Sequence, residues 1–477
     1  MKTLYALLLS LASAGLMAAA QDYRWAAPLA WVGLVPLLLA MARCGFAAVW
    51  LRLVFFYSVY LALALFWLRF TGPEMAWLLP MAIGYSWIFM PIPAAAAILA
   101  RTLPGRLLVL APAWMAAEIL ARIAPFHINW NLLGLPLADC PAMAQVAALG
   151  GPEATTFLVV LVNAGLAWFM LARRGRWRGI AVAAGAAGSA LFFGCLQLWT
   201  SPQAETVLRA GLVQPMISQR RVWTPANRVP LLQKMDGLID AVARRRPDLI
   251  VLPEWAVVGN LRYDAGLAQS ATGAVRRSGV PVLLGAGDFE AGRFYNAATL
   301  ITTDGRVSTY RKMRLIPFVE YSPRLLPYEP RGWVRFSPGV DATVFHLLPD
   351  IDVAELICLE DTLPDLARQF ANGGATVLLA LVNTENFAGT PEALQHLRRA
   401  QLTAIATGLP MLRAANSGIS CALDSRGRIL QALPAGRALA DIVQLPVAGR
   451  ATPYRWMGDW PVLGALIALI ALGRARV

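Results

Sequence analysis

The chain has 477 residues, of which 58% are hydrophobic and only 15% are charged. This composition excludes an ordinary water-soluble globular protein, where about a quarter of the residues carry a charge, and it indicates an integral membrane protein. The net charge of +14 does not by itself indicate nucleic-acid binding, because residues 201–456 hold 28 basic against 22 acidic residues and the rest of the chain holds 14 against 6. The sequence therefore predicts membrane helices with basic flanks, a polar insert and no nucleic-acid partner.

Eight apolar segments are long enough to cross a bilayer, near residues 3–20, 25–42, 47–68, 75–99, 105–123, 155–172, 179–199 and 458–473. The first also resembles a cleavable secretory signal, since Lys2, an apolar run and Ala18-Ala-Ala20 follow one another. The second span begins almost at once, which favours a retained helix. We expect a seven-helix domain at 1–200, a polar domain at 201–456 and an eighth helix with a short tail at 457–477.

The short loops predict the orientation of these helices. With the N-terminus inside, the inside flanks hold eleven Lys and Arg residues and the outside flanks only three. Both termini are then cytoplasmic, and the polar domain lies outside the cytoplasm. The apolar outside loop 125–156 is open to two interpretations, a lipid entrance at the membrane interface or a packed connector.

From residue 206 onward, strands alternate with helices. Strands are expected at 206–213, 248–253, 280–286, 294–302, 306–311, 343–347, 352–358, 375–382, 410–415 and 419–423, and helices at 226–246, 264–278, 364–373 and 391–407. About 240 residues of this pattern suit one layered α/β domain.

Three of these strands each end at one reactive side chain. Glu254 follows the apolar strand that ends at Pro253, Lys312 follows the strand that ends at Arg311, and Cys358 lies at a strand-to-helix turn. Active sites of α/β proteins lie at the carboxyl ends of strands. A lone buried cysteine is more often a small hydrophobic residue, but a carboxylate base and an ammonium beside it form an acyl-transfer site.

The other cysteines and the histidines carry no comparable signal. The five cysteines show neither CxxC pairing nor metal-ligand spacing, and the three histidines lie far apart in the sequence. We expect no disulfide framework, no metal and no cofactor. Lysine is scarce, at Lys2, Lys234 and Lys312 only, which favours a specific use for the ammonium group of Lys312.

Several segments together resemble a known family. They are Leu252-Pro-Glu-Trp255, Tyr310-Arg-Lys-Met-Arg-Leu-Ile-Pro-Phe-Val-Glu-Tyr321, Ile357-Cys-Leu-Glu360, Val213-Gln-Pro215, Leu158-Val-Val-Leu-Val-Asn163 and Arg413-Ala-Ala-Asn-Ser-Gly418. The first three look like the motifs of the carbon–nitrogen hydrolase (nitrilase-type) superfamily. Set between seven helices and one, they resemble the bacterial apolipoprotein N-acyltransferases. The resemblance implies a nitrilase-like αββα sandwich beside the helical transmembrane bundle.

The resemblance also assigns roles to residues. It implies that Glu254 is the general base, Lys312 the oxyanion-stabilising lysine and Cys358 the nucleophile. Two further glutamates, Glu320 and Glu360, match essential positions, although both could instead pair with Arg314 or Arg324. Trp223 corresponds to a substrate-binding tryptophan, and the backbone N–H of Leu359 is a second oxyanion donor.

The implied reaction has two steps and two membrane-anchored substrates. Cys358 takes an acyl chain from the sn-1 ester of a phospholipid, with phosphatidylethanolamine as the expected donor. The thioester then passes the chain to the α-amino group of a diacylglyceryl-cysteine at the N-terminus of an apolipoprotein. The resemblance implies a multi-pass protein of the bacterial inner membrane with a periplasmic catalytic domain, and a monomer suffices for this chemistry.

Two departures and three alternatives accompany this interpretation. Leu359 stands where the family often has an aromatic residue, and Asn383-Thr-Glu-Asn-Phe-Ala-Gly389 lacks the expected acidic and Trp residues. A membrane-tethered amidase or hydrolase would use the same three residues with water as acceptor. A non-catalytic lipid- or lipoprotein-binding role is a second alternative. A transporter is a third, which the scarcity of charges within the spans, Glu118 excepted, argues against.

Overall fold

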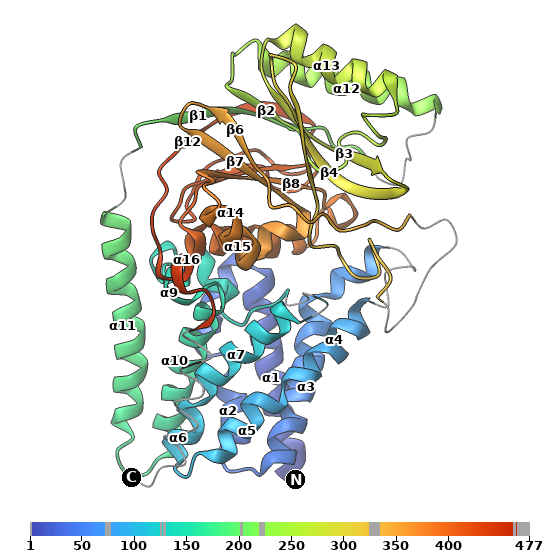
Figure 1. The fold of residues 1–477 in the computed structure, drawn as a ribbon. Coiled ribbons are helices and arrows are strands. Elements are labelled where there is room, and N and C mark those ends of the chain that lie inside the picture. The colour runs from blue at the N-terminus through green and yellow to red at the C-terminus, as the bar shows by residue number, and fades with distance from the viewer. Residues whose placement is uncertain are drawn as a thin grey trace. The chain divides into compact units, whose positions relative to one another are not determined.

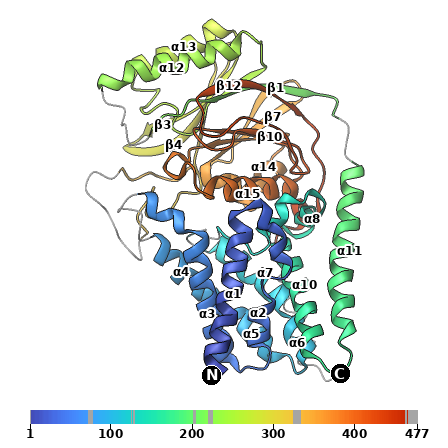
Figure 2. The same ribbon diagram turned by 180° about the vertical axis from the view of Figure 1, so that it is seen from behind.

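A computed structural model gives the structure of the chain and describes residues 2–71, 78–124, 126, 130–200, 204–218, 225–323, 334–460 and 464. The chain forms two compact units. The first comprises Met1–Ser201, Leu394–Ala406 and Thr452–Val477, and the second comprises Pro202–Ala393 and Thr407–Ala451. Figures 1 and 2 show helices in the first unit and strands with flanking helices in the second.

The first unit is a helical bundle. Its elements are α1 (Lys2–Asp22), η1 (Arg24–Trp31), α2 (Val35–Met41), α3 (Phe46–Ala64), η2 (Phe66–Thr71), α4 (Leu78–Phe89), α5 (Pro91–Leu99), α6 (Leu103–Leu108), α7 (Leu110–Ile123), η3 (Leu135–Asp139), α8 (Pro141–Ala144), α9 (Ala147–Gly150), α10 (Glu153–Leu171), α11 (Trp177–Trp199) and α16 (Pro453–Met457), together with most of α15 (Glu392–Thr407).

Seven segments of the described residues are long and apolar enough to cross a membrane. They are Thr3–Asp22, Arg24–Met41, Phe46–Ala64, Leu78–Leu99, Leu103–Ile123, Glu153–Leu171 and Trp177–Trp199. They confirm the first seven expected spans, whereas most of the eighth, at 458–473, lies outside the described residues.

Three of the spans are not the continuous α-helices that the apolar runs suggest, and one of them, the fifth, divides into α6 and α7 at Val109. The second is a 3-10 helix with Pro28 inside it, followed by α2, and the fourth divides into α4 and α5 just before Pro91. Proline has no N–H to donate and clashes with the preceding turn, so a helix ends or changes pitch there. In the second span, Asn163 of α10 accepts a hydrogen bond from the Leu34 backbone N–H (2.9 Å) and donates to the Ala30 carbonyl (2.9 Å).

The second unit contains two six-stranded sheets. The first has the order β12-β1-β2-β3-β4-β5 and the second the order β11-β10-β9-β8-β7-β6. The strands are β1 (Val207–Gln214), β2 (Leu249–Val251), β3 (Val282–Glu290), β4 (Arg293–Ile301), β5 (Val307–Arg311), β6 (Val344–Leu348), β7 (Ile351–Ile357), β8 (Val377–Val382), β9 (Met411–Ala415), β10 (Cys421–Leu423), β11 (Ile429–Ala432) and β12 (Leu439–Pro446). Contacts of β1 with β9 and of β4 with β7 pack the sheets face to face.

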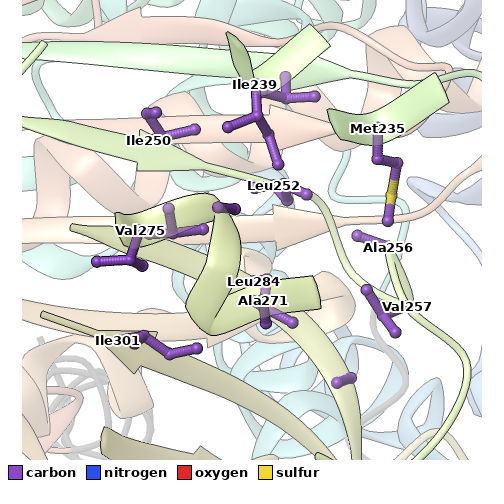
Figure 3. Close-up of a cluster of buried hydrophobic side chains, with 14 of the residues drawn as sticks. Met235, Ile239, Ile250, Leu252, Ala256, Val257, Ala271, Val275, Leu284 and Ile301 are labelled. Carbon is purple, nitrogen blue, oxygen red and sulfur yellow. The ribbon is translucent and has the colours of Figure 1, made fainter. Parts of the chain in front are cut away.

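Helices cover the outer faces of this sandwich. On the first sheet lie α12 (Pro225–Ala243) and α13 (Ala265–Ser278), and α14 (Pro364–Asn372) follows β7 (Figures 1 and 2). Figure 3 shows the core under α12 and α13, where Met235, Ile239 and Val275 meet Ile250 and Leu284 of the sheet. The parallel strands β1, β2 and β3 are buried on both faces over residues 210–214, 249–251 and 282–286, which explains the mostly apolar sequences of these stretches. The expected layered α/β sandwich is confirmed.

Candidate active site

The three reactive side chains expected from the sequence come together in the second unit. Glu254 lies three residues beyond the end of β2, Lys312 directly follows β5, and Cys358 directly follows β7. The Lys312 Nζ lies 3.5 Å from Glu254 Oε1, and Glu254, Lys312 and Cys358 are close enough to interact electrostatically with one another. Lys312 and Glu254 are only 1% and 5% exposed, so water does not screen these charges.

Unusual backbone angles mark each of the three motifs. Cys358, Trp255 and Phe318 have φ angles of 53°, 51° and 63°, in the left-handed region that side-chain-bearing residues rarely adopt. Such residues cluster at functional sites, where the surrounding structure holds them in place. At Cys358 the chain passes from β7 into a 3-10 turn, η4 (Cys358–Thr362), before α14 begins. This sharp turn leaves Cys358 half-buried rather than within the strand.

Asn296 of β4 joins the two carboxylates of the site, and the sequence analysis missed it. Its fully buried side-chain amide donates to Glu254 Oε1 (2.7 Å) and to Glu320 Oε1 (2.9 Å). Its own backbone carbonyl accepts from the Lys312 N–H (2.8 Å). An amide inside the apolar run of β4 was the available signal, because a buried polar group needs partners.

Glu320 is the closer anionic partner of Lys312. The Lys312 Nζ donates to Glu320 Oε1 at 3.0 Å, and the other carboxylate oxygen accepts from the Ile316 N–H (2.8 Å). Glu320 thereby fixes both the ammonium group and the start of the 316–320 turn. The expected alternative partner Arg324 lies outside the described residues.

Glu360 ties the Lys312 segment to the Cys358 turn. Its fully buried carboxylate accepts from the Tyr310 hydroxyl at 3.0 Å and from the backbone N–H groups of Met313 (2.7 Å), Arg314 (2.9 Å) and Ile357 (2.9 Å). It therefore bonds the backbone of Arg314 and not its guanidinium. Tyr310 was quoted in the sequence motif, but the sequence did not predict this contact.

The loop that carries Glu254 is held from two sides. A Cβ on Gly285 of β3 would lie 2.6 Å from the Glu254 Cα and from the Pro253 carbonyl oxygen, so only glycine permits this approach. On the other side, the Asn383 side chain donates to the Glu254 carbonyl (3.3 Å). Asn383 is the first residue of the segment 383–389, which departs from the family pattern. Its contact with the Glu254 loop is made by an amide N–H and does not require one of the acidic residues that the family pattern has in this segment.

Burial and neighbouring charges shift the pKa values of the three reactive groups. Desolvation raises the pKa of Glu254, although the nearby Lys312 ammonium opposes the shift. The pKa of the Cys358 thiol is raised by desolvation and then by the charge of Glu254. Burial alone would lower the pKa of Lys312, but Glu320 and Glu254 outweigh it and raise that pKa. At neutral pH the nucleophile is therefore a thiol that needs a base, beside a permanent cation.

Glu360 also has an altered proton affinity. Burial raises its pKa to about 7, against the effect of Lys312 and the three backbone donors.

The remaining predicted residues are less informative: Leu359 is half-buried in η4, and Trp223 lies outside the described residues. Within the described part of the chain, no group of three His, Cys, Asp or Glu side chains is arranged to hold a metal ion.

Comparisons with known proteins cover both units. Residues 209–447 match the carbon-nitrogen hydrolase family model, and residues 13–165 match the model for the apolipoprotein N-acyltransferase N-terminal domain. An apolipoprotein N-acyltransferase of Brucella melitensis is 33% identical over 392 residues, which are 76% of this chain and 72% of the relative. One from Bradyrhizobium diazoefficiens is 32% identical over 84% of this chain and 80% of the relative.

Among solved structures, the carbon-nitrogen hydrolase of Helicobacter pylori G27 is similar, with 17% sequence identity and a TM-score of 0.42. That similarity covers 54% of this chain and 95% of the hydrolase. The two family models and the 33% identity over most of both chains establish the relationship: this chain belongs to the bacterial apolipoprotein N-acyltransferase family.

Proposed function

We propose that this chain transfers an acyl chain from a membrane phospholipid to the N-terminal amine of diacylglyceryl apolipoproteins. The proposal rests on the close grouping of Glu254, Lys312 and Cys358 at the ends of three strands. A thiol, a neighbouring carboxylate and an adjacent ammonium are the parts that acyl transfer needs. The seven apolar spans suit a donor and an acceptor that both remain in the membrane.

In the first step, Cys358 attacks the sn-1 ester carbonyl of the phospholipid while Glu254 takes the thiol proton. The negative charge that forms on the carbonyl oxygen is stabilised by Lys312, together with the backbone N–H of Leu359. The ester C–O bond then breaks, Glu254 returns the proton to the departing alkoxide, and lysophospholipid leaves. An acyl thioester remains on Cys358.

In the second step, the α-amino group of a diacylglyceryl-cysteine attacks the thioester. Glu254 accepts the proton of the amine and returns it to the departing Cys358 sulfur, so the free thiol and an amide are formed. Because the donor product leaves before the acceptor reacts, the kinetics are ping-pong. Glu320 and Asn296 position the charged groups, Glu360 holds the Cys358 turn, and Trp223 contacts substrate.

The proposal includes a location and a preferred donor. The chain is a multi-pass protein of the bacterial inner membrane with both termini in the cytoplasm and the catalytic domain, 201–456, in the periplasm. The helices at 1–200 and 457–477 hold this domain at the outer leaflet, where both substrates lie. Phosphatidylethanolamine is the donor, a monomer is the working form, and no cofactor takes part.

A product assay tests the proposal against the hydrolase alternative. The purified chain is mixed with phosphatidylethanolamine vesicles and a synthetic diacylglyceryl lipopeptide, and the products are identified by mass spectrometry. We expect lysophospholipid and N-acylated lipopeptide in equal amounts from the wild type and from Cys195→Ala, and neither product from Cys358→Ala. Free fatty acid in place of the N-acylated lipopeptide would identify a hydrolase and overturn the proposal.

A further inference from the structure

A pair of arginines contacts Cys44 at one end of the helical bundle, far along the chain from any residue of the candidate active site. Arg52 lies in the first turns of α3, and Arg106 lies in α6. Both side chains reach Cys44 in the short connection between α2 and α3. Figures 1 and 2 show α6 at the same end of the bundle as the N-terminus.

Both guanidinium groups are bonded only to uncharged groups among the described residues. Arg52 donates to the Ala40 carbonyl (2.7 Å) and to the Cys44 sulfur, and Arg106 donates to the carbonyls of Ala100 (3.2 Å) and Cys44 (3.2 Å). A guanidinium has five N–H donors. The Nη2 groups of both arginines therefore remain available within the described structure.

Among the described residues, the connections that adjoin the pair carry positive charge and no negative charge. The adjoining connections, residues 42–45, 100–102 and 172–176, include five arginines and no Asp or Glu. Two described acidic residues of this unit lie toward the other end of its helices: Asp22 is the last residue of α1, and Glu153 is the first residue of α10. Two half-buried like charges that share one neighbour repel each other, and a bound anion removes that cost.

The position of the pair indicates the kind of anion. Arg52 and Arg106 belong to segments that are apolar enough to cross a membrane. Beside Arg106 and Cys44 lies a hollow of about 10 Å³, with walls that include Met41, Val49 and Leu107. That volume suits one water-sized group such as a single phosphate oxygen. The apolar walls suit a ligand that also carries acyl chains, and free phosphate lacks these.

We propose that Arg52 and Arg106 form a binding site for the phosphate of an anionic phospholipid, in the leaflet at the N-terminal end of the bundle. The two guanidinium groups grip the phosphate oxygens through their remaining N–H donors, as arginine does at phosphate sites elsewhere. The bound lipid ties α3 and α6 together through the Cys44 turn. The proposal is independent of the acyl-transfer reaction and predicts a lipid that is retained rather than consumed.

The test measures lipid binding to the full-length protein. The wild type and the double variant Arg52→Gln, Arg106→Gln are purified in detergent, incubated with phosphatidylglycerol or phosphatidylethanolamine, and examined by native mass spectrometry. We expect the variant to bind phosphatidylglycerol at least about tenfold more weakly, since a charged hydrogen bond is lost at each arginine, and to bind phosphatidylethanolamine as before.

A matched variant distinguishes a specific two-arginine site from the general positive charge at this end of the bundle. Arg101→Gln with Arg173→Gln also removes two positive charges from this end, at exposed positions, and we expect it to lower phosphatidylglycerol binding less than twofold. Equal losses in the two double variants, or no loss in either, would overturn the proposal. Displacement of the lipid by inorganic phosphate, with equal thermal stabilisation by that ion, would also overturn it in favour of a free-anion site.

If the glutamine variant does not fold, a lysine variant tests the proposed lipid site instead. Arg52→Lys with Arg106→Lys keeps both charges, and with them the signal for orientation in the membrane. Lysine cannot bind a phosphate through two parallel N–H groups. We expect several-fold weaker phosphatidylglycerol binding, whereas binding equal to the wild type would contradict a site built from guanidinium groups.

Discussion

Lys312 faces two carboxylates, and in the proposed reaction this imbalance determines how the neighbouring thiol reacts. Its ammonium lies 3.0 Å from Glu320 and 3.5 Å from Glu254. Glu320 takes the shorter contact, which leaves Glu254 able to exchange a proton with Cys358. A cysteine in this setting does not rest as a thiolate, because its pKa is raised by desolvation and by the charge of Glu254. The proposed reaction therefore depends on the protonation of Glu254.

The pH profile of the rate of thioester formation should have an acid limb that reflects the ionisation of Glu254. Because its pKa is raised above the ordinary value of 4.5, the carboxyl stays protonated to a higher pH, and only the ionised form can accept the thiol proton. Single-turnover acylation should rise with pH through a midpoint above 4.5, and Glu254→Gln should lack that limb. A limb centred at or below 4.5 would show that another group supplies the base.

Removing the Lys312 charge should damage folding as well as catalysis. Lys312→Met leaves two buried carboxylates without their cation. Removing one member of a buried ion pair lowers the free energy of unfolding by about 3–5 kcal/mol. The midpoint of thermal unfolding should fall, and acylation should be abolished. Lys234→Met, on the exposed surface of α12, is the matched control and should change neither. A Lys312→Met protein as stable as the control would contradict the ion-pair network described here.

At the scale of elements, the packing of β3 beneath the Glu254 loop is as important as the reactive groups. Gly285→Ala would place a methyl group 2.6 Å from backbone atoms of Pro253 and Glu254, which cannot move aside as a flexible side chain does. We expect acylation to slow by about 100-fold, since a displacement near 1 Å has effects of this size.

A second glycine provides the control for this prediction. Gly237→Ala lies in α12, where an added Cβ meets no atom within 4 Å. It should leave acylation unchanged and raise stability by about 0.5–1 kcal/mol, because alanine favours a helix. Equal acylation by the two variants would show that the close approach at Gly285 does not position Glu254.

Sequence patterns predicted most elements because the central strands are continuously apolar and the helices amphipathic. They did not predict β11 and β12, whose residues are partly exposed and mixed in polarity. β12 gains its stability by pairing with β1, more than 200 residues earlier in the chain, and no local pattern carries such information.

The residues of the candidate site were likewise predictable only where a local sequence pattern marks them. Glu254, Lys312 and Cys358 were predicted because each ends a recognisable strand. Asn296 and Gly285 were not, since their importance arises from atoms that approach from other strands. The contacts of Glu360 likewise depend on the fold, although its motif was visible in the sequence.

At the scale of the whole molecule, the proposed orientation can be tested by thiol labelling in intact cells. Asp304→Cys lies in the exposed turn between β4 and β5, and Arg174→Cys lies in the exposed connection between α10 and α11. In a background without the native cysteines, a membrane-impermeant maleimide should label position 304 in intact cells and position 174 only after permeabilisation. The reverse pattern would overturn the periplasmic location of the catalytic domain.

The most direct test of the central claim is the intact mass of the purified protein after incubation with phosphatidylethanolamine. We expect the addition of one acyl chain, located on Cys358 by peptide mapping and absent from Cys358→Ser. This adduct should persist in buffer and disappear when a diacylglyceryl lipopeptide is added, with the same mass gained by its amine. An unmodified Cys358, or an adduct lost to water at the same rate with and without the lipopeptide, would contradict the account.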